Sequence, residues 1–125
     1  MLPFRMQFKT GMPAYGQVVY AVKKAIISGG MKPGDRFPSV RTLSQELRIN
    51  PNTAHKVVAA LVNEGLLEVK PGIGTLVADS QPSTKLQRGD LLNGEVERVV
   101  VEAKKLQLEL ADVVRAIEQH WNRLS

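Results

Sequence analysis

Cysteine is absent from this chain of 125 residues, which excludes disulfide bonds and metal sites built from thiolates. Long apolar runs are also lacking, because no stretch approaches the roughly 18 apolar residues that a membrane-spanning helix needs. Residues 1–11 (MLPFRMQFKTG) hold no sustained apolar segment of the kind that a signal peptide contains. We therefore expect a cytoplasmic protein with no membrane partner.

Patterns typical of catalysis are missing as well. The two histidines, His55 and His120, are not spaced with a second ligand for a metal ion on one helix face. No glycine-rich phosphate loop follows a strand and opens a helix, and no nucleophile elbow is present. The chain is also shorter than the roughly 200 residues that larger catalytic architectures need. The sequence therefore predicts a protein that is not an enzyme and uses no cofactor or metal ion.

Charge is unevenly distributed along the chain, although the formal total is only +5. Residues 1–78 contain 10 Lys or Arg against 4 Asp or Glu, a balance of +6, and residues 79–125 contain 7 against 8, a balance of −1. A basic excess suits a surface that meets phosphate groups, although basic surface also keeps small proteins soluble. The first part of the chain is therefore the candidate for nucleic-acid binding.

Residues 37–65 (FPSVRTLSQELRINPNTAHKVVAALVNEG) are predicted to form two short helices separated by a brief break. Ser39 can cap the first helix, Asn50 can cap the second, and Pro51 fits a first helical position, where its missing N–H costs nothing. Gly65 is suited to the left-handed conformation that closes a helix. Two helices joined by a tight turn are a helix-turn-helix, a pattern that also occurs in proteins that do not bind DNA.

The second of these helices has two different faces. Its apolar stripe is predicted to contain Ala54, Val58 and Leu61, with Val57 and Val62 on the flanks. The opposite, outward face carries Asn52, Lys56, Ala59 and Asn63. Asn and Lys can hydrogen-bond base edges or phosphates, and Ala permits close approach to a groove. His55 lies on the flank, where it suits contact with a phosphate or a base better than catalysis.

The flanking segments complete a recognisable pattern. A helix is predicted over residues 14–28, and a β-hairpin is predicted from strands at residues 66–70 and 75–78. Three helices followed by a hairpin make a winged helix, in which Gly74 would let the wing backbone come close to a groove or a phosphate. Ordinary turn geometry also accounts for a glycine there. Residues 4–9 alternate apolar and polar side chains, which suggests a short extended segment or edge strand.

The last part of the chain begins with a polar, proline-containing linker at residues 79–84. Apolar residues then recur at helical spacing and predict two helices, over about residues 90–106 and 110–124, with a break near residues 107–109. Their apolar faces are widened by Val100, Val101 and Val114. One helical hairpin cannot cover so much apolar surface, so we expect a partner surface, most simply a second copy of the chain.

The expected fold is mainly α with a small β-hairpin, a winged helix-turn-helix followed by a C-terminal helical hairpin. Residues 1–78 would form the winged-helix DNA-binding domain, residues 79–84 a linker, and residues 85–125 a two-helix dimerisation region.

Short motifs along the first part of the chain occur in a specific order and spacing. They are PAYGQ at 13–17, PGD at 33–35, PSVR at 38–41, NPNT at 50–53, EGL at 64–66 and GIGT at 72–75. With these motifs, residues 13 to 78 resemble the GntR family of bacterial transcription regulators. The short two-helix tail resembles that of the YtrA subfamily, whose members dimerise through it. Gln107 stands where that family often has a glycine, which leaves the form of the turn between the tail helices open.

The resemblance implies a set of DNA contacts from three elements. They are Ser39 and Arg41 at the start of the first helix of the pair, Asn52, Thr53, His55 and Lys56 on the recognition helix, and Gly74 in the wing. For Asn52 and Lys56 the helix geometry points the same way, whereas Thr53 and His55 lie on its flanks.

Two functions from different classes remain at this point. The favoured one is a homodimeric, sequence-specific DNA-binding transcriptional regulator, a repressor that binds an inverted-repeat operator in double-stranded DNA. The alternative is a winged-helix protein-protein interaction module without DNA binding. Two observations count against it: the basic charge of residues 1–78 and the outward positions of Arg41, Asn52 and Lys56. Whether a small-molecule effector exists is left open by the sequence.

Overall fold

The computed structural model describes residues 1–124 of the chain, which divides into two compact units. The first unit comprises Met1–Ser80, and we call it the head. The second unit begins at Gln81, and we call it the tail.

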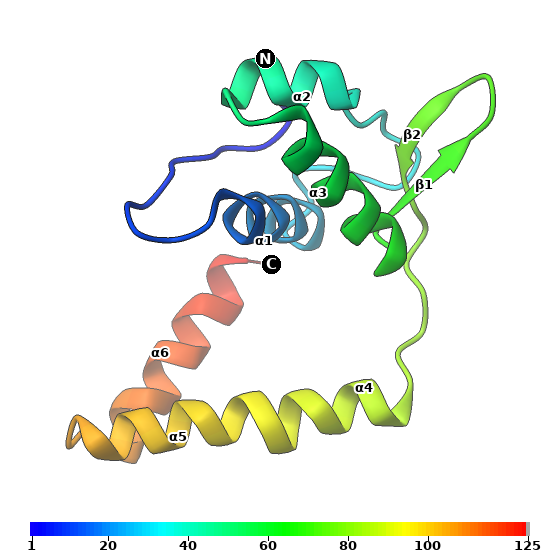
Figure 1. Cartoon of the computed structure of the whole chain (residues 1–125). Coiled ribbons are helices and arrows are strands. Elements are labelled where there is room, and N and C mark those ends of the chain that lie inside the picture. The colour runs from blue at the N-terminus through cyan, green and yellow to red at the C-terminus, as the bar shows by residue number, and fades with distance from the viewer. Residues whose placement is uncertain (125) are drawn as a thin grey trace. The chain divides into compact units, whose positions relative to one another are not determined.

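The head contains three helices followed by a β-hairpin (Figure 1). The elements are α1 (Ala14–Ile27), α2 (Val40–Leu47), α3 (Pro51–Asn63), β1 (Leu67–Lys70) and β2 (Gly74–Val77). The two strands are antiparallel, with Leu67 opposite Val77 and Lys70 opposite Gly74. This arrangement is a winged helix, which confirms the predicted fold class of the head.

Helices α2 and α3 begin at the residues that the sequence predicts. The Ser39 hydroxyl oxygen accepts a hydrogen bond from the Thr42 N–H at 3.1 Å, and the Asn50 side chain accepts one from the Asn52 N–H at 2.8 Å. Pro51 takes the first position of α3. Each cap satisfies a backbone donor that a helix leaves unpaired at its start. The two caps therefore set the short break of the helix-turn-helix.

Residues with a left-handed backbone end all three helices of the head. Gly29 follows α1 with φ 85°, Arg48 follows α2 with φ 53°, and Gly65 follows α3 with φ 78°. After α3, the Leu66 N–H donates to the Leu61 carbonyl oxygen at 2.9 Å, which satisfies a carbonyl in the last turn. Glycine adopts this conformation freely, whereas for Arg48 it costs about 1–2 kcal/mol. The packing of α2 on α3 must offset that cost.

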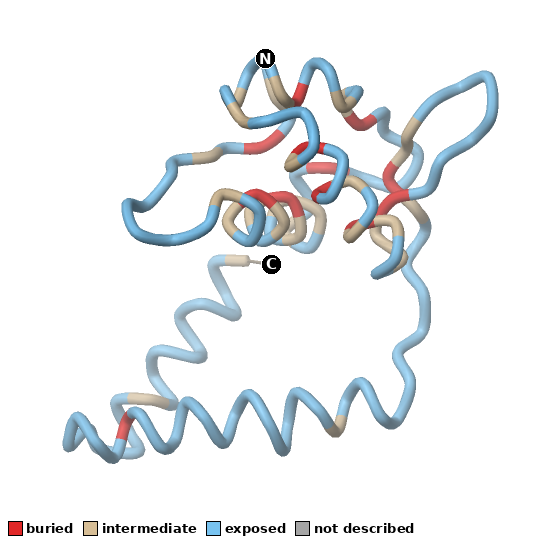
Figure 2. The backbone as a smooth tube through the Cα atoms, in the orientation of Figure 1, coloured by how far each residue is buried: buried red, intermediate tan, exposed pale blue. Residues whose placement is uncertain are grey.

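One hydrophobic core lies between the helices and the hairpin of the head, coloured red in Figure 2. Its side chains with no exposed surface are Val18, Val22, Leu43, Ala54, Val57 and Leu61. Each buried Val or Leu contributes about 1.5–3 kcal/mol, so this cluster holds α3 against α1 and α2.

The apolar stripe of α3 differs by one residue from the prediction. Val57, which we expected on a flank, is fully buried at the centre of the stripe, and Val58 is only partly buried. Val57 and Val58 fit the helical period with Ala54 and Leu61 equally well, so the packing of α3 against α1, α2 and β1 decides which of them is buried. The exposed face of α3 therefore lies opposite Val57 rather than opposite Val58.

Of the two alternatives for residues 4–9, a short extended segment or an edge strand, the edge strand is wrong, because these residues form no strand. Phe4 is buried, and its ring stacks on Phe37 with the ring centroids 6.2 Å apart. The Gln17 side chain accepts from the Lys9 N–H at 2.7 Å and donates to the Lys9 carbonyl at 3.1 Å. A helix side chain thus satisfies backbone groups that a neighbouring strand would otherwise have paired.

The hairpin is tied to the segment that precedes α2. The Phe37 N–H donates to the Thr75 carbonyl at 2.8 Å, and Arg36 forms an isolated β-bridge with Leu76. Strand β2 therefore has backbone partners on both sides. The sequence did not reveal this pairing, which connects the wing to the start of α2.

The tail contains two helical runs joined by a turn. The first consists of α4 (Lys85–Gly89), one π-helical stretch, η1 (Asp90–Glu95), and α5 (Val96–Lys105), which follow one another without a break. The second is α6 (Leu110–Arg123). Two tail helices were predicted, but the start of the first at residue 90 is wrong, because the helix begins at Lys85.

A reciprocal cap explains the earlier start. The Thr84 hydroxyl oxygen accepts from the Gln87 N–H at 3.1 Å, and the Gln87 side chain accepts from the Thr84 N–H at 2.8 Å. This capping box satisfies two backbone donors at once. Gly94 lies inside η1, where a π turn accommodates an extra residue within a continuous helix.

The turn between the tail helices has the same form as the ends of α1 and α3, although it contains no glycine. Gln107 is left-handed with φ 61°, and its N–H donates to the Lys104 carbonyl at 3.1 Å. The Leu108 N–H donates to the Ala103 carbonyl at 3.0 Å. Glutamine therefore adopts the conformation that glycine favours at this kind of helix end.

The tail buries very little of its apolar surface. Among its described residues only Ala103 is buried (Figure 2). Large apolar side chains remain exposed on both helical runs, among them Val96, Val99, Val100, Val114 and Ile117. The tail as a single copy therefore has helices but no core of its own.

Candidate nucleic-acid interface

The candidate interface consists of α3, the start of α2 and the wing. Helix α3 packs against α1, α2 and β1, so its orientation is set by the core of the head. The wing is fastened beside the start of α2 by the backbone bond between Phe37 and Thr75. Because these contacts join the three elements, they lie beside one another in the head (Figure 1).

The recognition helix exposes most of the predicted contact residues. Asn52, His55 and Lys56 are exposed, while Ala54 and Val57 are fully buried on the opposite face. Thr53 is only half-buried, so it lies at the boundary between the two faces. Amide, imidazole and ammonium groups at adjacent positions of one exposed helix face can donate hydrogen bonds to phosphate oxygens or to acceptors on base edges.

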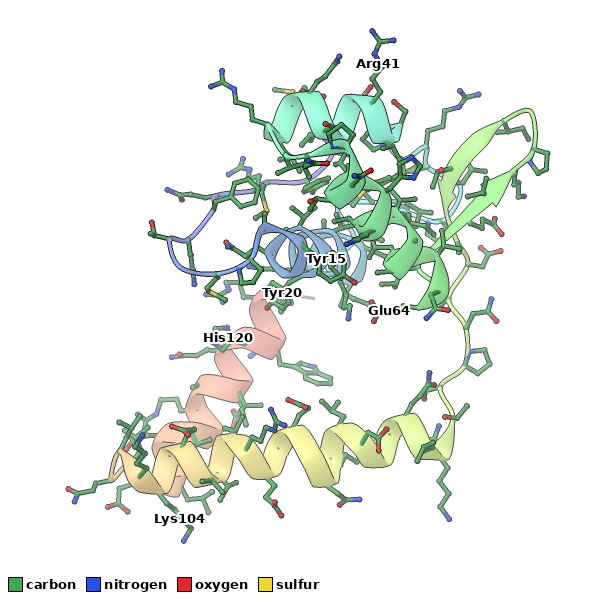
Figure 3. The ribbon with its side chains drawn as sticks, viewed as in Figure 1. Tyr15, Tyr20, Arg41, Glu64, Lys104 and His120 are labelled. Carbon is green, nitrogen blue, oxygen red and sulfur yellow. The ribbon has the colours of Figure 1, made fainter. Side chains whose placement is uncertain are left out.

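The start of α2 carries two of the predicted residues in different situations. Arg41 is exposed and points away from the helix (Figure 3). Ser39 is the N-cap, and its hydroxyl also donates to the Thr42 hydroxyl oxygen at 3.0 Å. A hydroxyl has a single proton, so Ser39 could donate to a phosphate only by turning that proton away from Thr42. Arg41 is therefore the more accessible donor of the two.

The tip of the wing depends on its glycines. Gly74 has φ 117° and is exposed, and a Cβ added to it would meet no atom within 4 Å. The requirement for glycine comes from the backbone conformation, since L residues rarely adopt that φ and are strained there. The open space around Gly74 leaves room for close approach by another molecule.

Three carboxylates of the head are neutralised by cations nearby. Glu46 pairs with the Met1 amino group at 2.6 Å, Glu64 pairs with Lys23 at 2.7 Å, and Glu68 lies 3.7 Å from Lys70. Within residues 1–124 no carboxylate pairs with Arg41 or Lys56. These two cations are therefore free to meet phosphates, whose neutralisation provides much of the affinity of proteins for DNA.

Arg36 belongs to the same surface, and the sequence did not single it out. Its backbone bridges to Leu76 of the wing, its side chain is exposed, and it lies between the wing and the N-cap of α2. The only signal in the sequence is a basic residue directly before Phe37. The significance of that position became visible only through the long-range pairing with β2.

Other kinds of site are not found in the part of the chain that the structure describes. Residues 1–124 contain no group of three or more His, Cys, Asp or Glu side chains that could hold a metal ion. In the same residues no helix combines the length and the apolar character needed to cross a membrane.

Comparison of the sequence with known proteins gives a consistent result. Residues 14–77 match the family described as "Bacterial regulatory proteins, gntR family". The HTH-type transcriptional repressor YtrA of Bacillus subtilis (strain 168) is 30% identical over 103 residues, which cover 82% of this chain and 79% of that protein. The uncharacterized HTH-type transcriptional regulator YhcF of the same organism is 26% identical over 112 residues, covering 90% of this chain and 93% of that one.

Solved structures resemble the fold as well. A protein described as a transcriptional antiterminator from Listeria monocytogenes EGD-e matches with a TM-score of 0.85 over 97% of this chain and 91% of that chain, at 19% identity. The DNA-binding domain of AraR in complex with an operator matches with a TM-score of 0.53 at 29% identity, over 59% of this chain and 95% of that one. The first likeness concerns the fold alone, and the second relates the head to a domain seen on DNA.

Proposed function

Because the chain belongs to the GntR family of bacterial regulatory proteins, which it matches over residues 14–77, we propose that its head reads operator DNA with α3, the start of α2 and the wing. The chain is a DNA-binding transcriptional regulator, and what is proposed is how it binds. The observation that carries the proposal is the two-sided α3, with Ala54, Val57 and Leu61 fully buried and Asn52, His55 and Lys56 exposed.

On the recognition helix, Asn52 and Lys56 are the residues that read bases. An Asn side chain can bond to adenine in two places, and Lys can bond to the acceptors of guanine in the major groove. His55, exposed beside them, contacts a phosphate or a base at the edge of the groove. Thr53 is half-buried, so we expect its hydroxyl to bind a nearby phosphate rather than a base.

The other proposed contacts position the head on the duplex. Arg41 projects from α2 and binds a phosphate or a guanine, and Ser39 donates to a phosphate once its proton turns away from Thr42. Gly74 lets the wing backbone approach the adjacent groove. Arg36, next to the wing, adds a further phosphate contact. Phosphate contacts of this kind fix the register of a protein on DNA without reading its sequence.

The tail joins two copies of the chain. The exposed apolar side chains of α5 and α6 support this part of the proposal, because a single copy leaves them in water. In this arrangement residues 1–78 act as the DNA-binding domain, residues 79–84 as a linker and residues 85–125 as the dimerisation region. Two-fold pairing presents two identical recognition helices, which suits an inverted-repeat operator.

The regulator acts as a repressor in the cytoplasm, where it blocks a promoter by occupying its operator. The relative YtrA, which is named a repressor, supports this direction of control. Nothing in the proposed action requires a catalytic step or a cofactor.

The test is the affinity of single variants for a selected operator. Arg41→Ala and Lys56→Ala should each weaken binding by about 1–3 kcal/mol if the contact is to a base edge, with specificity relaxed at one position. If the contact is to a phosphate, all sequences should lose affinity alike and the salt slope should fall by about one. Lys104→Ala is the matched control, because it removes the same charge from the exposed surface of α5, outside the proposed interface.

Unchanged operator affinity in both Arg41→Ala and Lys56→Ala would contradict the proposed interface. It would favour the alternative of a winged-helix module that docks a protein. Circular dichroism of each variant separates lost contacts from lost folding, and both side chains are exposed, so the fold should persist.

A further inference from the structure

A groove of about 710 Å³ lies within the head, between the N-terminal segment and α1. Its volume falls in the range of roughly 300–1,000 Å³ that is typical of small-molecule sites. Apolar and aromatic side chains form much of its lining, including Phe4, Met6, Met12, Tyr20 and Ala21. None of these residues belongs to the proposed DNA interface.

The charged side chains that line the groove all have one sign. Arg5, Lys9 and Lys24 line it, and no Asp or Glu does. Within residues 1–124 no carboxylate pairs with any of these three cations. Three cations without a carboxylate partner, around an apolar groove, favour the binding of an anion that also has an apolar part.

Hydrogen bonds hold the wall of the groove in place. The Gln17 side chain donates to the Met12 carbonyl at 2.9 Å and exchanges two further bonds with the backbone of Lys9. Phe4 is fixed at the other end by its stacking on Phe37. A preformed wall reduces the ordering cost that a ligand would otherwise have to overcome.

We propose that this groove binds a small amphipathic anion, with the apolar part against Phe4, Met12 and Tyr20 and the acidic group near Arg5, Lys9 or Lys24. The binding step stands independently of the proposed function, and only its effect on DNA rests on that function.

The groove is physically connected to the recognition helix. Val18 and Val22 of α1 belong to the same core as Val57 and Leu61 of α3, and Lys23 of α1 pairs with Glu64 at the end of α3. A ligand that prefers one position of α1 therefore shifts the position of α3 on DNA. The coupling is reciprocal, so DNA changes the affinity for the ligand by the same factor.

The binding test uses two fluorescent probes with the same aromatic scaffold. Anilinonaphthalene sulfonate carries a negative charge, and N-phenylnaphthylamine lacks the sulfonate. The full-length protein should bind the sulfonate more tightly. The double variant Arg5→Glu with Lys24→Glu should lower that affinity by about tenfold while the affinity for the neutral probe stays within about twofold. The control is Lys104→Glu with Lys105→Glu, which makes the same charge change on α5 and should alter neither.

A second variant tests the groove by its volume. Gly16 lines the groove, and a Cβ built on it meets no atom within 4 Å, so Gly16→Phe can fill the space without a clash at its Cβ. It should weaken both probes by about tenfold or more. Unchanged binding in both groove variants would overturn the proposal, because the probes would then bind elsewhere. A change of sedimentation in either groove variant would also overturn it, since the occupant would then be a second copy of the chain.

The link to DNA is measured separately with the same protein. Saturating anilinonaphthalene sulfonate should change operator affinity by about fivefold or more in the wild type and not in Gly16→Phe. Equal operator affinity with and without the probe would overturn the regulatory step. If the protein bound the probe in the groove but bound no DNA, the proposed function would fail while the binding site stood.

Discussion

The head and the tail are both rich in apolar residues at helical spacing, yet only the head has a core. In the head, Val57 and Leu61 of α3 are completely buried, whereas in the tail Val99 and Ile117 keep 48% and 50% of their surface exposed. The difference lies in what surrounds the helix. Two other helices and a hairpin pack around α3, whereas the described residues of the tail form only two helical runs. Identical periodicity therefore produces a core in one region and an uncovered surface in the other.

The two regions also differ in charge. Residues 1–78 have a balance of +6 and residues 79–125 a balance of −1. An excess of positive charge opposes self-association and attracts a polyanion, while a near-neutral apolar surface favours contact with another protein surface. The head is therefore suited to meet DNA and the tail to meet another protein surface.

The largest expected effect comes from removing one region. Deleting residues 85–125 should leave the head folded on its own core and convert the protein into a monomer. Operator affinity should fall by about 10²–10⁴-fold, because two linked half-site contacts become one. Sedimentation and gel-shift measurements on the truncated chain check this, and a truncated protein that still sediments as a dimer would refute the role of the tail.

Two shortened side chains, one in each region, should destabilise the protein in different ways. Leu61→Ala should lower the free energy of unfolding by about 2–5 kcal/mol at any protein concentration, because it opens a cavity in the head. Val100→Ala should act through association instead, so its effect on the melting temperature should be largest at high protein concentration and should vanish as the protein is diluted below the dissociation constant of the dimer. Thermal melts over a dilution series distinguish the two, and identical behaviour of both variants would contradict the division of roles.

The spacing of the operator tests how firmly the tail pairs two heads. Inserting about 5 bp between the half-sites turns one of them to the opposite side of the duplex and should lower affinity at least about tenfold. Inserting about 10 bp returns both half-sites to the same side of the duplex and should lower affinity less. The polar segment at residues 79–84 could soften this limit by flexing. Footprinting over such a series decides the point, and equal protection at every spacing would mean that the heads are not rigidly paired.

The smallest expected effect concerns the turn of the tail. Gln107→Gly should raise the free energy of unfolding by about 0.5–1 kcal/mol. Glycine removes the strain of the left-handed backbone, but it is also more flexible in the unfolded chain, which offsets part of the gain. Gln107→Ala is the control and should show no such gain, because alanine is as strained at φ 61° as glutamine. Chemical denaturation of both variants at one concentration measures the difference.

Much of the candidate site could be predicted because its signals are local. Asn52 and Lys56 are exposed as their positions on α3 predict, and the caps at Ser39 and Asn50 begin the two helices as expected. Arg36 was missed because its place beside the wing depends on a bridge to Leu76, 40 positions away. The DNA contacts of all these residues stay predictions.

The starts and ends of the head helices and the hairpin follow from the sequence alone, because caps, glycines and periodicity act over a few residues. The sequence did not determine where the segment around Phe4 would go, since alternation alone does not distinguish a strand from a chain that packs Phe4 on Phe37. Nor did it reveal the groove beside α1, which depends on Gln17 holding the backbone of Lys9 and Met12. These features are decided by the tertiary structure because they depend on which distant surfaces meet, and each such contact is stabilised only when the whole core has formed.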